Sequence, residues 1–172
     1  MSPAPKHSVL ARDLMSRPVW RLSSRSTVRE AAEFLTRHGI SAAPVEDGQG
    51  RWLGVFSMTD VARSVASSLS SPEPQRSLEV REPVPAGVPM SLESLASLEV
   101  VDVMTPGMVT VFPDSSVDEV LHSLLRFKVH RVFVIDGQSG NLEGVITTMD
   151  LLRWLECSRD RATGARAEGK EI

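Results

Sequence analysis

Hydrophobic residues recur with a helical period in two segments of the chain. Apolar positions at i, i+3, i+4 and i+7 place one stripe on one face of a helix. These positions are Val28, Ala31, Ala32 and Leu35 in the first segment and Val117, Val120, Leu121 and Leu124 in the second. Each stripe follows a capping-box pattern, in which a hydroxyl residue and a glutamate three positions later satisfy free N–H groups at the helix start. The capping pairs are Thr27 with Glu30 and Ser116 with Glu119. The pattern therefore predicts two amphipathic helices.

The two predicted helices differ at their C-terminal ends. Gly39 follows the first helix and is suited to the left-handed conformation that closes many helices. Lys128 stands at the corresponding place in the second helix. We therefore expect the second helix to be closed in a different way.

Short, β-branched apolar runs follow each helix and are separated by turn sequences. Runs of this length and composition favour strands, and Asp-Gly pairs between them favour hairpin turns. The expected strands are Ile40–Val45 and Trp52–Phe56 in the first half and Val129–Ile135 and Leu142–Ile146 in the second. A further helix is expected after each hairpin, from Asp60 to about Ser67 and from Asp150 to about Glu156.

Motifs in the first half recur in the same order in the second half. Asp13-Leu14-Met15-Ser16 returns as Asp102-Val103-Met104-Thr105, and Gly54-Val55-Phe56-Ser57-Met58-Thr59-Asp60 returns as Gly144-Val145-Ile146-Thr147-Thr148-Met149-Asp150. Ordered recurrence indicates duplication. The predicted fold class is α/β (α+β), with two βαββα repeats packed face to face about a pseudo-two-fold axis.

The predicted boundaries follow from composition. The repeats span residues 11–66 and 101–157, after an N-terminal segment at 1–10. Residues 67–100 read as a serine- and proline-rich linker, in which Ser91–Leu98 could regain a helical turn. The polar residues 158–172 are expected to form a flexible tail.

Charge and composition narrow the functional classes. The 172 residues carry a formal net charge of −3, which argues against a nucleic-acid or anionic-membrane partner, because those partners select a basic face. No stretch approaches the ~18 apolar residues of a membrane span. A single cysteine, Cys157, excludes an internal disulfide, and together with the lack of a signal-like N-terminus it predicts a cytoplasmic protein.

The repeated Gly-hydrophobic-hydrophobic-Ser/Thr-x-x-Asp motif is the strongest candidate site. It places Ser57 or Thr147 at a helix start and Asp60 or Asp150 in the first turn. A helix N-terminus favours anions such as phosphate, and a carboxylate can accept hydrogen bonds from both hydroxyls of a ribose. The motif is also a capping box that needs no ligand. The preceding glycine, which permits close backbone approach, and the recurrence of the motif leave ligand binding and capping alone about equally favoured.

The doubled set of motifs resembles the CBS domain, and two in tandem resemble a Bateman module. The resemblance implies binding of an adenosine compound (AMP, ADP, ATP or S-adenosylmethionine) in a cleft between the repeats, with regulation of a partner protein. Asp60 and Asp150 would hold ribose hydroxyls, with Ser57 and Thr147 near ribose or phosphate. The residues bordering the base would be Val19, Trp20, Met108, Val109 and Thr110. His130 and Arg131 match a His-Arg pair that contacts phosphates in the γ subunit of AMP-activated protein kinase.

The first repeat departs from this pattern. Ser41 and Ala42 stand where the second repeat has His130 and Arg131, so we expect two unequal clefts. Trp20 would stack on a base, fill the site or pack into the core, and core packing is the favoured alternative. His130 and Arg131 would otherwise form a solvated strand edge.

No catalytic motif accompanies these features. The chain has no Walker A, Rossmann, nucleophile-elbow or His-Glu-x-x-His sequence, and its histidines lack metal-ligand spacing. Asp13 and Asp102 read as capping or turn residues. We expect a regulatory module that is not an enzyme and has no cofactor or metal, an adenosine nucleotide being its regulatory ligand. The alternative is a ligand-free interaction platform. In either case the partly covered face at Leu121–Leu124 predicts a symmetric homodimer that acts on an unidentified protein partner.

Overall fold

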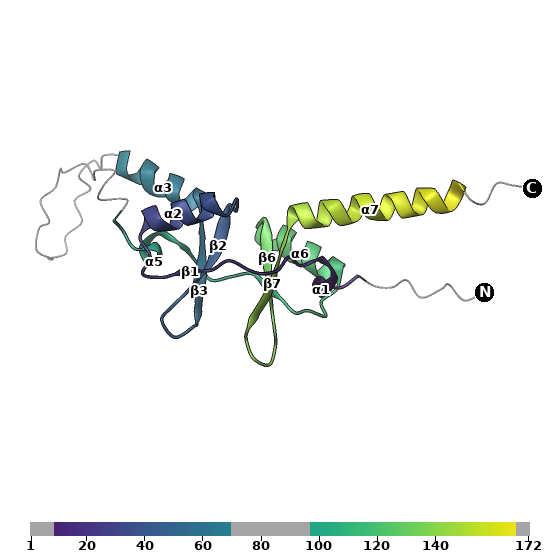
Figure 1. Cartoon of the computed structure of the whole chain (residues 1–172), viewed down its shortest axis with the longest axis horizontal. Coiled ribbons are helices and arrows are strands. Elements are labelled where there is room, and N and C mark those ends of the chain that lie inside the picture. The colour runs from purple at the N-terminus through teal and green to yellow at the C-terminus, as the bar shows by residue number, and fades with distance from the viewer. Residues whose placement is uncertain (1–8, 70–96, 168–172) are drawn as a thin grey trace, which may run out of the picture. The chain divides into compact units, whose positions relative to one another are not determined.

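The computed structural model describes residues 9–69 and 97–167 and contains the expected βαββα unit twice (Figure 1). The first copy consists of β1 (Leu22–Ser23), α2 (Val28–Arg37), β2 (Ala42–Glu46), β3 (Trp52–Ser57) and α3 (Met58–Leu69). The second consists of β5 (Thr110–Val111), α6 (Val117–Phe127), β6 (Arg131–Ile135), β7 (Leu142–Thr147) and α7 (Thr148–Ala167). Before these units lie α1 (Ala11–Leu14), α5 (Val100–Val103) and β4 (Thr105–Pro106). The predicted mixed α/β fold is confirmed.

The two sheets share one pairing pattern. β1 runs parallel to β2, which pairs antiparallel with β3; β5, β6 and β7 repeat this arrangement. Both hairpins have a register shift at the same place, at Val45/Glu46 and at Val134/Ile135. Because even an irregularity recurs, the structure supports the duplication that the motifs indicate.

The chain forms two compact units, and the opening segment of each repeat belongs to the unit that contains the rest of the other repeat. One unit joins the segment up to Val19 to the chain from Val109 onward, and the other is Trp20–Met108. Helix α1 therefore contacts α7 and β7, while α5 contacts α2 and β3. Strand β4 adds a fourth strand beside β3, and Ser16 forms the corresponding isolated bridge with Val145.

Each unit has its own hydrophobic core, and an exchanged helix contributes to each. Ala11 of α1 is fully buried among β5, α6, β6 and β7, and Val100 of α5 is fully buried among β1, α2, β2 and β3. The core around the second repeat comprises Ala11, Val111, Val120, Leu124, Val132, Val134, Ile146 and Leu151. The core around the first repeat comprises Leu22, Val28, Ala31, Leu35, Ala43, Val45, Phe56 and Val100.

Several element boundaries differ from those expected. Strands β2 and β6 begin two residues later than their apolar runs, at Ala42 and Arg131. Helices α3 and α7 begin directly after Ser57 and Thr147, whose hydroxyls approach the carboxylates of the first turns. Helix α7 also continues past residue 157 to Ala167, so the expected tail is helical over 158–167. Ala and Arg in this stretch are strong helix formers, which offsets the cost of Gly164.

The helix ends correct one expectation and confirm another. Gly39 has φ of 62°, as expected for a closing glycine after α2. Lys128 has φ of 53° and closes α6 in the same left-handed conformation. The expectation of a different closure was wrong, because the position forces this conformation on a residue that has a Cβ.

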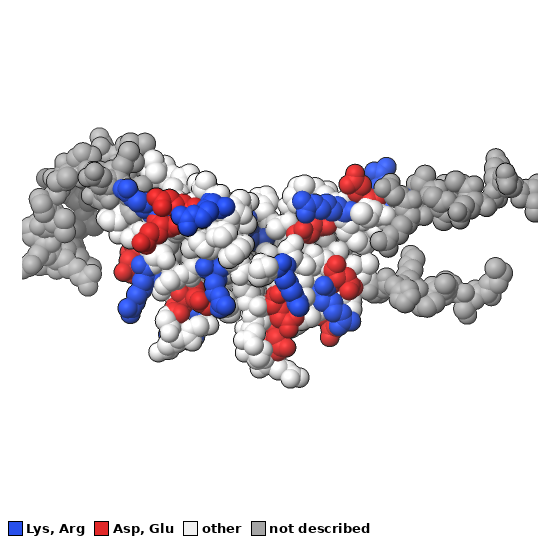
Figure 2. Space-filling model, viewed as in Figure 1, with Lys and Arg blue, Asp and Glu red and all other residues white. Residues whose placement is uncertain are grey.

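Other expectations meet the structure only in part. Most of the segment expected to regain a helical turn, residues 91–96, lies outside the described residues. Over the described ranges, no helix has the length and apolarity needed to cross a membrane, and no cluster of His, Cys, Asp and Glu suits a metal ion. Figure 2 shows acidic and basic side chains interspersed on the face in view. That face has no basic stripe of the kind that nucleic acid selects.

Candidate functional site

Both repeated motifs form the same hydrogen-bonded turn at a helix start. The Ser57 N–H and hydroxyl donate to Oδ2 of Asp60 over 2.8 and 2.6 Å. The Thr147 N–H and hydroxyl donate to Oδ2 of Asp150 over the same distances. In each repeat, Oδ2 of the aspartate is therefore used for capping. Whether the motif can also bind a ligand depends on the hydrogen bonds of the other oxygen, Oδ1.

The second carboxylate oxygens are in different environments. Oδ1 of Asp60 accepts hydrogen bonds from Arg63 (2.8 Å) and from the Thr105 hydroxyl (3.0 Å), and Asp60 is only 1% exposed. Oδ1 of Asp150 lies 3.6 Å from Arg153, and the Asp150 side chain is 12% exposed. At 3.6 Å this is an ion pair without a hydrogen bond. Asp150 therefore retains acceptor capacity that Asp60 has lost.

The difference arises in the exchanged opening segments. Thr105 pairs with Val55 and reaches Asp60 from β4, and Ser16 holds the equivalent place beside Val145. Ser16 is exposed, and among the hydrogen bonds of the described residues none joins its hydroxyl to Asp150. The first motif is thus completed by protein groups.

The exchange of opening segments between the units also explains why each motif contains a glycine. A Cβ at Gly54 would collide with the backbone carbonyl oxygen of Thr105 and lie 3.0 Å from Cα of Pro106. A Cβ at Gly144 would collide with the Met15 side chain, at 2.8 Å from its Cβ and against its sulfur. Both glycines therefore allow close approach of the opposite repeat's Asp-x-Met-Ser/Thr segment. They do not by themselves indicate a ligand.

His130 and Arg131 lie next to the start of α7. Arg131 is in register with Thr147 across β6 and β7, and Thr148 N–H donates to the His130 carbonyl over 3.1 Å. Burial lowers the pKa of the Arg131 guanidinium from its ordinary value. Arginine nevertheless remains cationic at neutral pH. The structure therefore brings an imidazole and a partly buried cation together with Thr147 and Asp150 in one unit.

The first repeat has the same backbone arrangement without these groups. Ala42 is in register with Ser57, and Met58 N–H donates to the Ser41 carbonyl over 3.1 Å. Neither Ser41 nor Ala42 carries a cationic side chain. The chemical inequality between the repeats follows directly from this comparison.

The residues expected to border a base are divided between the units. Val19, Val109 and Thr110 belong to the unit that contains Asp150, and Trp20 and Met108 belong to the other. Val109 packs against the core and its carbonyl accepts a hydrogen bond of 2.9 Å from Phe133 N–H. Thr110 is exposed at the start of β5.

Trp20 is not a core residue. It is 44% exposed and stacks on His38, with ring centroids 4.0 Å apart, and meets Phe34 edge-on at 6.1 Å. The favoured expectation of core packing was therefore wrong. The sequence had no periodic signal for this stack, because Trp20 lies outside any helix or strand.

Three further residues at the motifs were not singled out from the sequence. Thr105 escaped notice because its contact with Asp60 spans the exchange of segments. Arg63 and Arg153 each pair with the aspartate three residues before them. Their equivalent positions in the two repeats are a signal from which these ion pairs could have been found.

The family of the chain can now be stated. A family model described as the CBS domain matches residues 11–67 and 100–157. The chain belongs to the CBS domain family and is a tandem CBS pair.

Solved structures share this fold. The CBS domain pair of protein MJ0100, in complex with 5′-methylthioadenosine and S-adenosyl-L-methionine, is 21% identical with a TM-score of 0.67, covering 88% of this chain and 98% of that one. A CBS domain protein from Pyrobaculum aerophilum complexed with AMP is 21% identical with a TM-score of 0.63, covering 83% and 90%.

One relative is an enzyme by name. The L-aspartate semialdehyde sulfurtransferase of Methanocaldococcus jannaschii is 23% identical over 144 residues, which are 84% of this chain. The chain covers 23% of that protein's length. The similarity therefore includes a CBS pair and leaves most of that protein without a counterpart here.

Proposed function

We propose that this CBS pair is a regulatory module that binds an adenosine-containing nucleotide through its second repeat. The observation that supports this most is the state of Asp150: among the described residues, its Oδ1 has an ion pair of 3.6 Å to an exposed arginine and no hydrogen bond. A ribose hydroxyl can displace such a pair at small cost, since exposed ion pairs contribute little. The equivalent oxygen of Asp60 has two hydrogen-bond donors already.

The surrounding groups of the second repeat suit the remaining parts of a nucleotide. Arg131 and His130 offer charge-assisted donors for a phosphate beside Thr147. The N-terminus of α7 adds a dipole that favours an anion. Val19, Val109 and Thr110 belong to the same compact unit and would border the base. Solved CBS pairs that contain AMP or S-adenosyl-L-methionine support the choice of an adenosine ligand.

The proposed role is regulation of a protein partner and not catalysis. A ligand can shift a protein between two arrangements only if it binds them unequally. Closure of Thr147, Asp150 and Arg131 around a nucleotide would provide that difference, and the partner would respond to it. We place the protein in the cytoplasm, as its single cysteine suggests.

A homodimer formed through the second repeat is part of this proposal. Leu121 and Leu125 of α6 and Leu152 and Leu155 of α7 are exposed. Arg153 and Glu156 flank the two α7 leucines, and two copies of α7 related by a two-fold axis could pair these opposite charges. A ligand-free interaction platform is the second candidate function, and this exposed apolar surface is the observation that favours it.

Calorimetric titration of the full chain with adenosine, AMP and ATP tests the nucleotide proposal. Arg131→Ala should weaken AMP and ATP by roughly 1.5–3 kcal/mol and spare adenosine, because only the phosphates lose a charge-assisted contact. Asp150→Ala should weaken all three ligands. Ser41→Ala, at the place equivalent to His130, is the matched control and should change none of the affinities.

Two results would count against nucleotide binding. If the unmodified protein binds none of the three ligands at millimolar concentration, the platform function is the better explanation. If it binds them and neither Arg131→Ala nor Asp150→Ala alters the affinities, the second repeat does not hold the ligand.

A further inference from the structure

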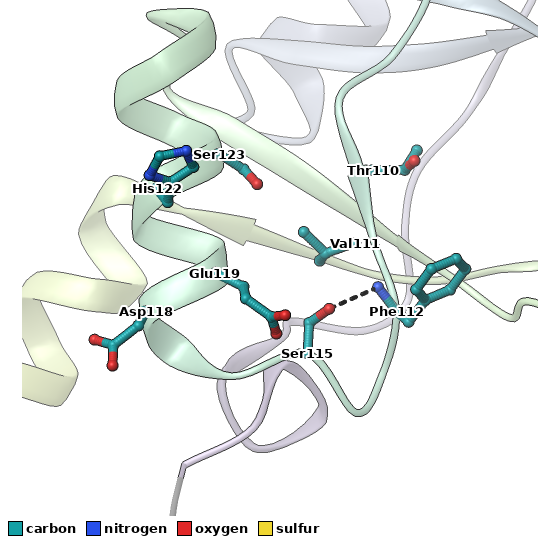
Figure 3. A pocket seen from close by; sticks show the side chains of 8 residues that line it. All are labelled: Thr110, Val111, Phe112, Ser115, Asp118, Glu119, His122 and Ser123. Carbon is teal, nitrogen blue, oxygen red and sulfur yellow. Dashed lines mark hydrogen bonds between the residues drawn. The ribbon is translucent and has the colours of Figure 1, made fainter.

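A cavity of the second repeat lies between α6 and β5, and it shares Thr110 with the nucleotide site proposed above. Its volume is about 560 Å³. Figure 3 shows Glu119 and Ser123 pointing from α6 into the space in front of the β5 segment. The volume falls in the range of small-molecule sites and exceeds what a bare ion needs. His130, Arg131, Thr147 and Asp150 are not part of its lining.

The first repeat has aromatic rings at two positions equivalent to residues at or next to this cavity. Phe34 occupies the position of Ser123, and Trp20 occupies that of Val109. These two rings meet edge-on at 6.1 Å, and both pack against His38. The second repeat has the smaller side chains of Ser123 and Val109 at these positions, which place no ring beside the cavity.

The lining is more acidic than the equivalent positions of the first repeat, where Glu30 and Glu33 balance two arginines. Asp118 and Glu119 contribute two carboxylates to the cavity. The first repeat has Arg29 at the place of Asp118 and Arg21 at the place of Thr110. The cavity therefore combines smaller side chains at two positions with an acid and a hydroxyl in place of two arginines, and with His122 in place of Glu33.

Glu119 has one oxygen available to the cavity. Its Oε2 accepts hydrogen bonds from the Ser116 N–H (2.7 Å) and hydroxyl (3.2 Å), which close the capping box of α6. Among the hydrogen bonds of the described residues, none involves its Oε1. The capping contacts thus hold the carboxylate in place and leave an acceptor directed away from the helix backbone.

An aromatic ring, the imidazole of His122 and hydroxyls also line the cavity. Phe112 is 55% exposed, and its ring packs over Gly137, where an added Cβ would lie 3.1 Å from the ring edge. An exposed ring face attracts a cation. Thr110 and Ser123 add hydroxyl oxygens that accept hydrogen bonds from N–H donors.

We propose that this cavity binds an organic cation, a guanidinium or primary amine carried on a short aliphatic chain. The cationic group would donate to Oε1 of Glu119, and the aliphatic chain would pass along the Phe112 ring. The two carboxylates would repel the phosphates of a nucleotide. The cation is either a free small molecule or the lysine or arginine side chain of a partner, since both present the same chemistry.

Titration of the full chain with agmatine, followed by amide chemical shifts and calorimetry, tests this proposal. Agmatine should bind saturably and shift the amides of α6 and β5, and butylurea, a neutral relative of similar shape, should not bind. Glu119→Gln keeps an acceptor for the capping box and removes the charge, so it should weaken agmatine by about tenfold or more. Glu30→Gln makes the same change in the first repeat and should have no effect.

A second variant reproduces the closed cavity of the first repeat. Ser123→Phe should abolish agmatine binding while leaving the far-ultraviolet circular dichroism unchanged. If this variant does not fold, the Glu119→Gln comparison alone decides the question. Tighter binding of an acetylated, amidated Gly-Arg-Gly peptide than of agmatine identifies a partner side chain as the ligand, and the reverse order identifies a free cation.

Any one of three outcomes would overturn the proposal. The first is that neither agmatine nor the Gly-Arg-Gly peptide binds at millimolar concentration. The second is that butylurea binds as well as agmatine, and the third is that Glu119→Gln leaves the agmatine affinity unchanged.

Discussion

The hydroxyl of Thr105 donates a hydrogen bond of 3.0 Å to Oδ1 of Asp60. This contact joins the opening segment of the second repeat to the helix-capping carboxylate of the first, within one compact unit. The carboxylate is almost completely buried, and its hydrogen bonds come from Ser57, Arg63 and Thr105. The first copy of the duplicated motif therefore stabilises the fold, and the second copy retains an acceptor oxygen, Oδ1 of Asp150, that has no hydrogen-bond donor among the described residues.

Replacement of Thr105 by valine should reduce the free energy of unfolding by about 1–2 kcal/mol. The substitution keeps the shape of the side chain and removes a hydrogen bond to a buried charged group. Chemical denaturation monitored by circular dichroism measures the change. Ser16→Ala at the equivalent position should cost a few tenths of a kcal/mol at most, because no hydrogen bond among the described residues joins its hydroxyl to Asp150. Equal losses in the two variants would contradict the asymmetry between the repeats.

Gly54→Ala should destabilise the protein more than Gly144→Ala. The new methyl group at residue 54 meets the backbone of Thr105 and Pro106, which can move only if β4 moves. At residue 144 it meets the Met15 side chain, which is flexible and can adopt another rotamer. Overpacking of this kind costs about 1–3 kcal/mol. We expect the upper end of that range for residue 54 and the lower end for residue 144.

Thermal unfolding of both variants, with Gly48→Ala as control, tests this order. Gly48 has a negative φ and no atom within 4 Å of an added Cβ, so its replacement should be nearly neutral. A larger loss at residue 144 than at residue 54 would show that the Met15 contact is the more rigid one.

The sequence predicted those features that depend on neighbouring positions. The stripe of α2, its capping box at Thr27 and its closing Gly39 are local patterns, and the structure contains all three. The exchange of opening segments was not predictable, because the contact of Gly144 with Met15 joins residues far apart in the chain. The difference between Asp60 and Asp150 depends on whether one hydroxyl reaches one oxygen, and both motifs present the same residue types.

Lys128→Gly should stabilise the protein by about 1 kcal/mol. Lys128 has φ of 53°, a left-handed conformation that a residue with a Cβ adopts at a cost of roughly 1–2 kcal/mol. Glycine removes this cost, although it also gains freedom in the unfolded chain. Gly39→Lys makes the reverse change at the end of α2, where φ is 62°, and should be destabilising by a similar amount. Denaturation midpoints of both variants provide the measurement, and loss of stability in Lys128→Gly would refute the assignment of strain.

Asp47 and Asp136 in the two hairpin turns should stabilise the fold at neutral pH, and this stabilisation should be lost in acid. Backbone N–H groups and the side chain of Arg51 lower the pKa of Asp47, and the N–H groups of Ser139 and Gln138 lower that of Asp136. A folded-state pKa below the unfolded value of about 3.9 means that the stabilisation is fully present above that value. It is lost as the pH falls through the folded pKa.

Carboxyl carbon chemical shifts measured between neutral and strongly acidic pH would report both aspartates. Each titration midpoint should lie below the value of an unstructured aspartate, and Asp136→Asn should remove one of the two transitions. Midpoints at or above the unstructured value would mean that the turn hydrogen bonds do not persist in solution.

Leu125→Glu should convert the proposed homodimer to a monomer. Leu125 is 69% exposed on α6, and the equivalent position on α2 is the polar Thr36. The same contrast between the repeats holds for Leu121 against Ala32 and for Leu152 against Ala62. Burying one leucine contributes about 1.5–3 kcal/mol, and a glutamate in its place would add the cost of burying a charge.

Because the Leu125 side chain is exposed within one chain, the substitution should not disturb the fold of the monomer. Sedimentation velocity at tens of micromolar should therefore show a dimer for the unmodified protein and for Thr36→Glu, and a monomer for Leu125→Glu. A dimer that survives Leu125→Glu and dissociates in Thr36→Glu would place the interface on the first repeat instead.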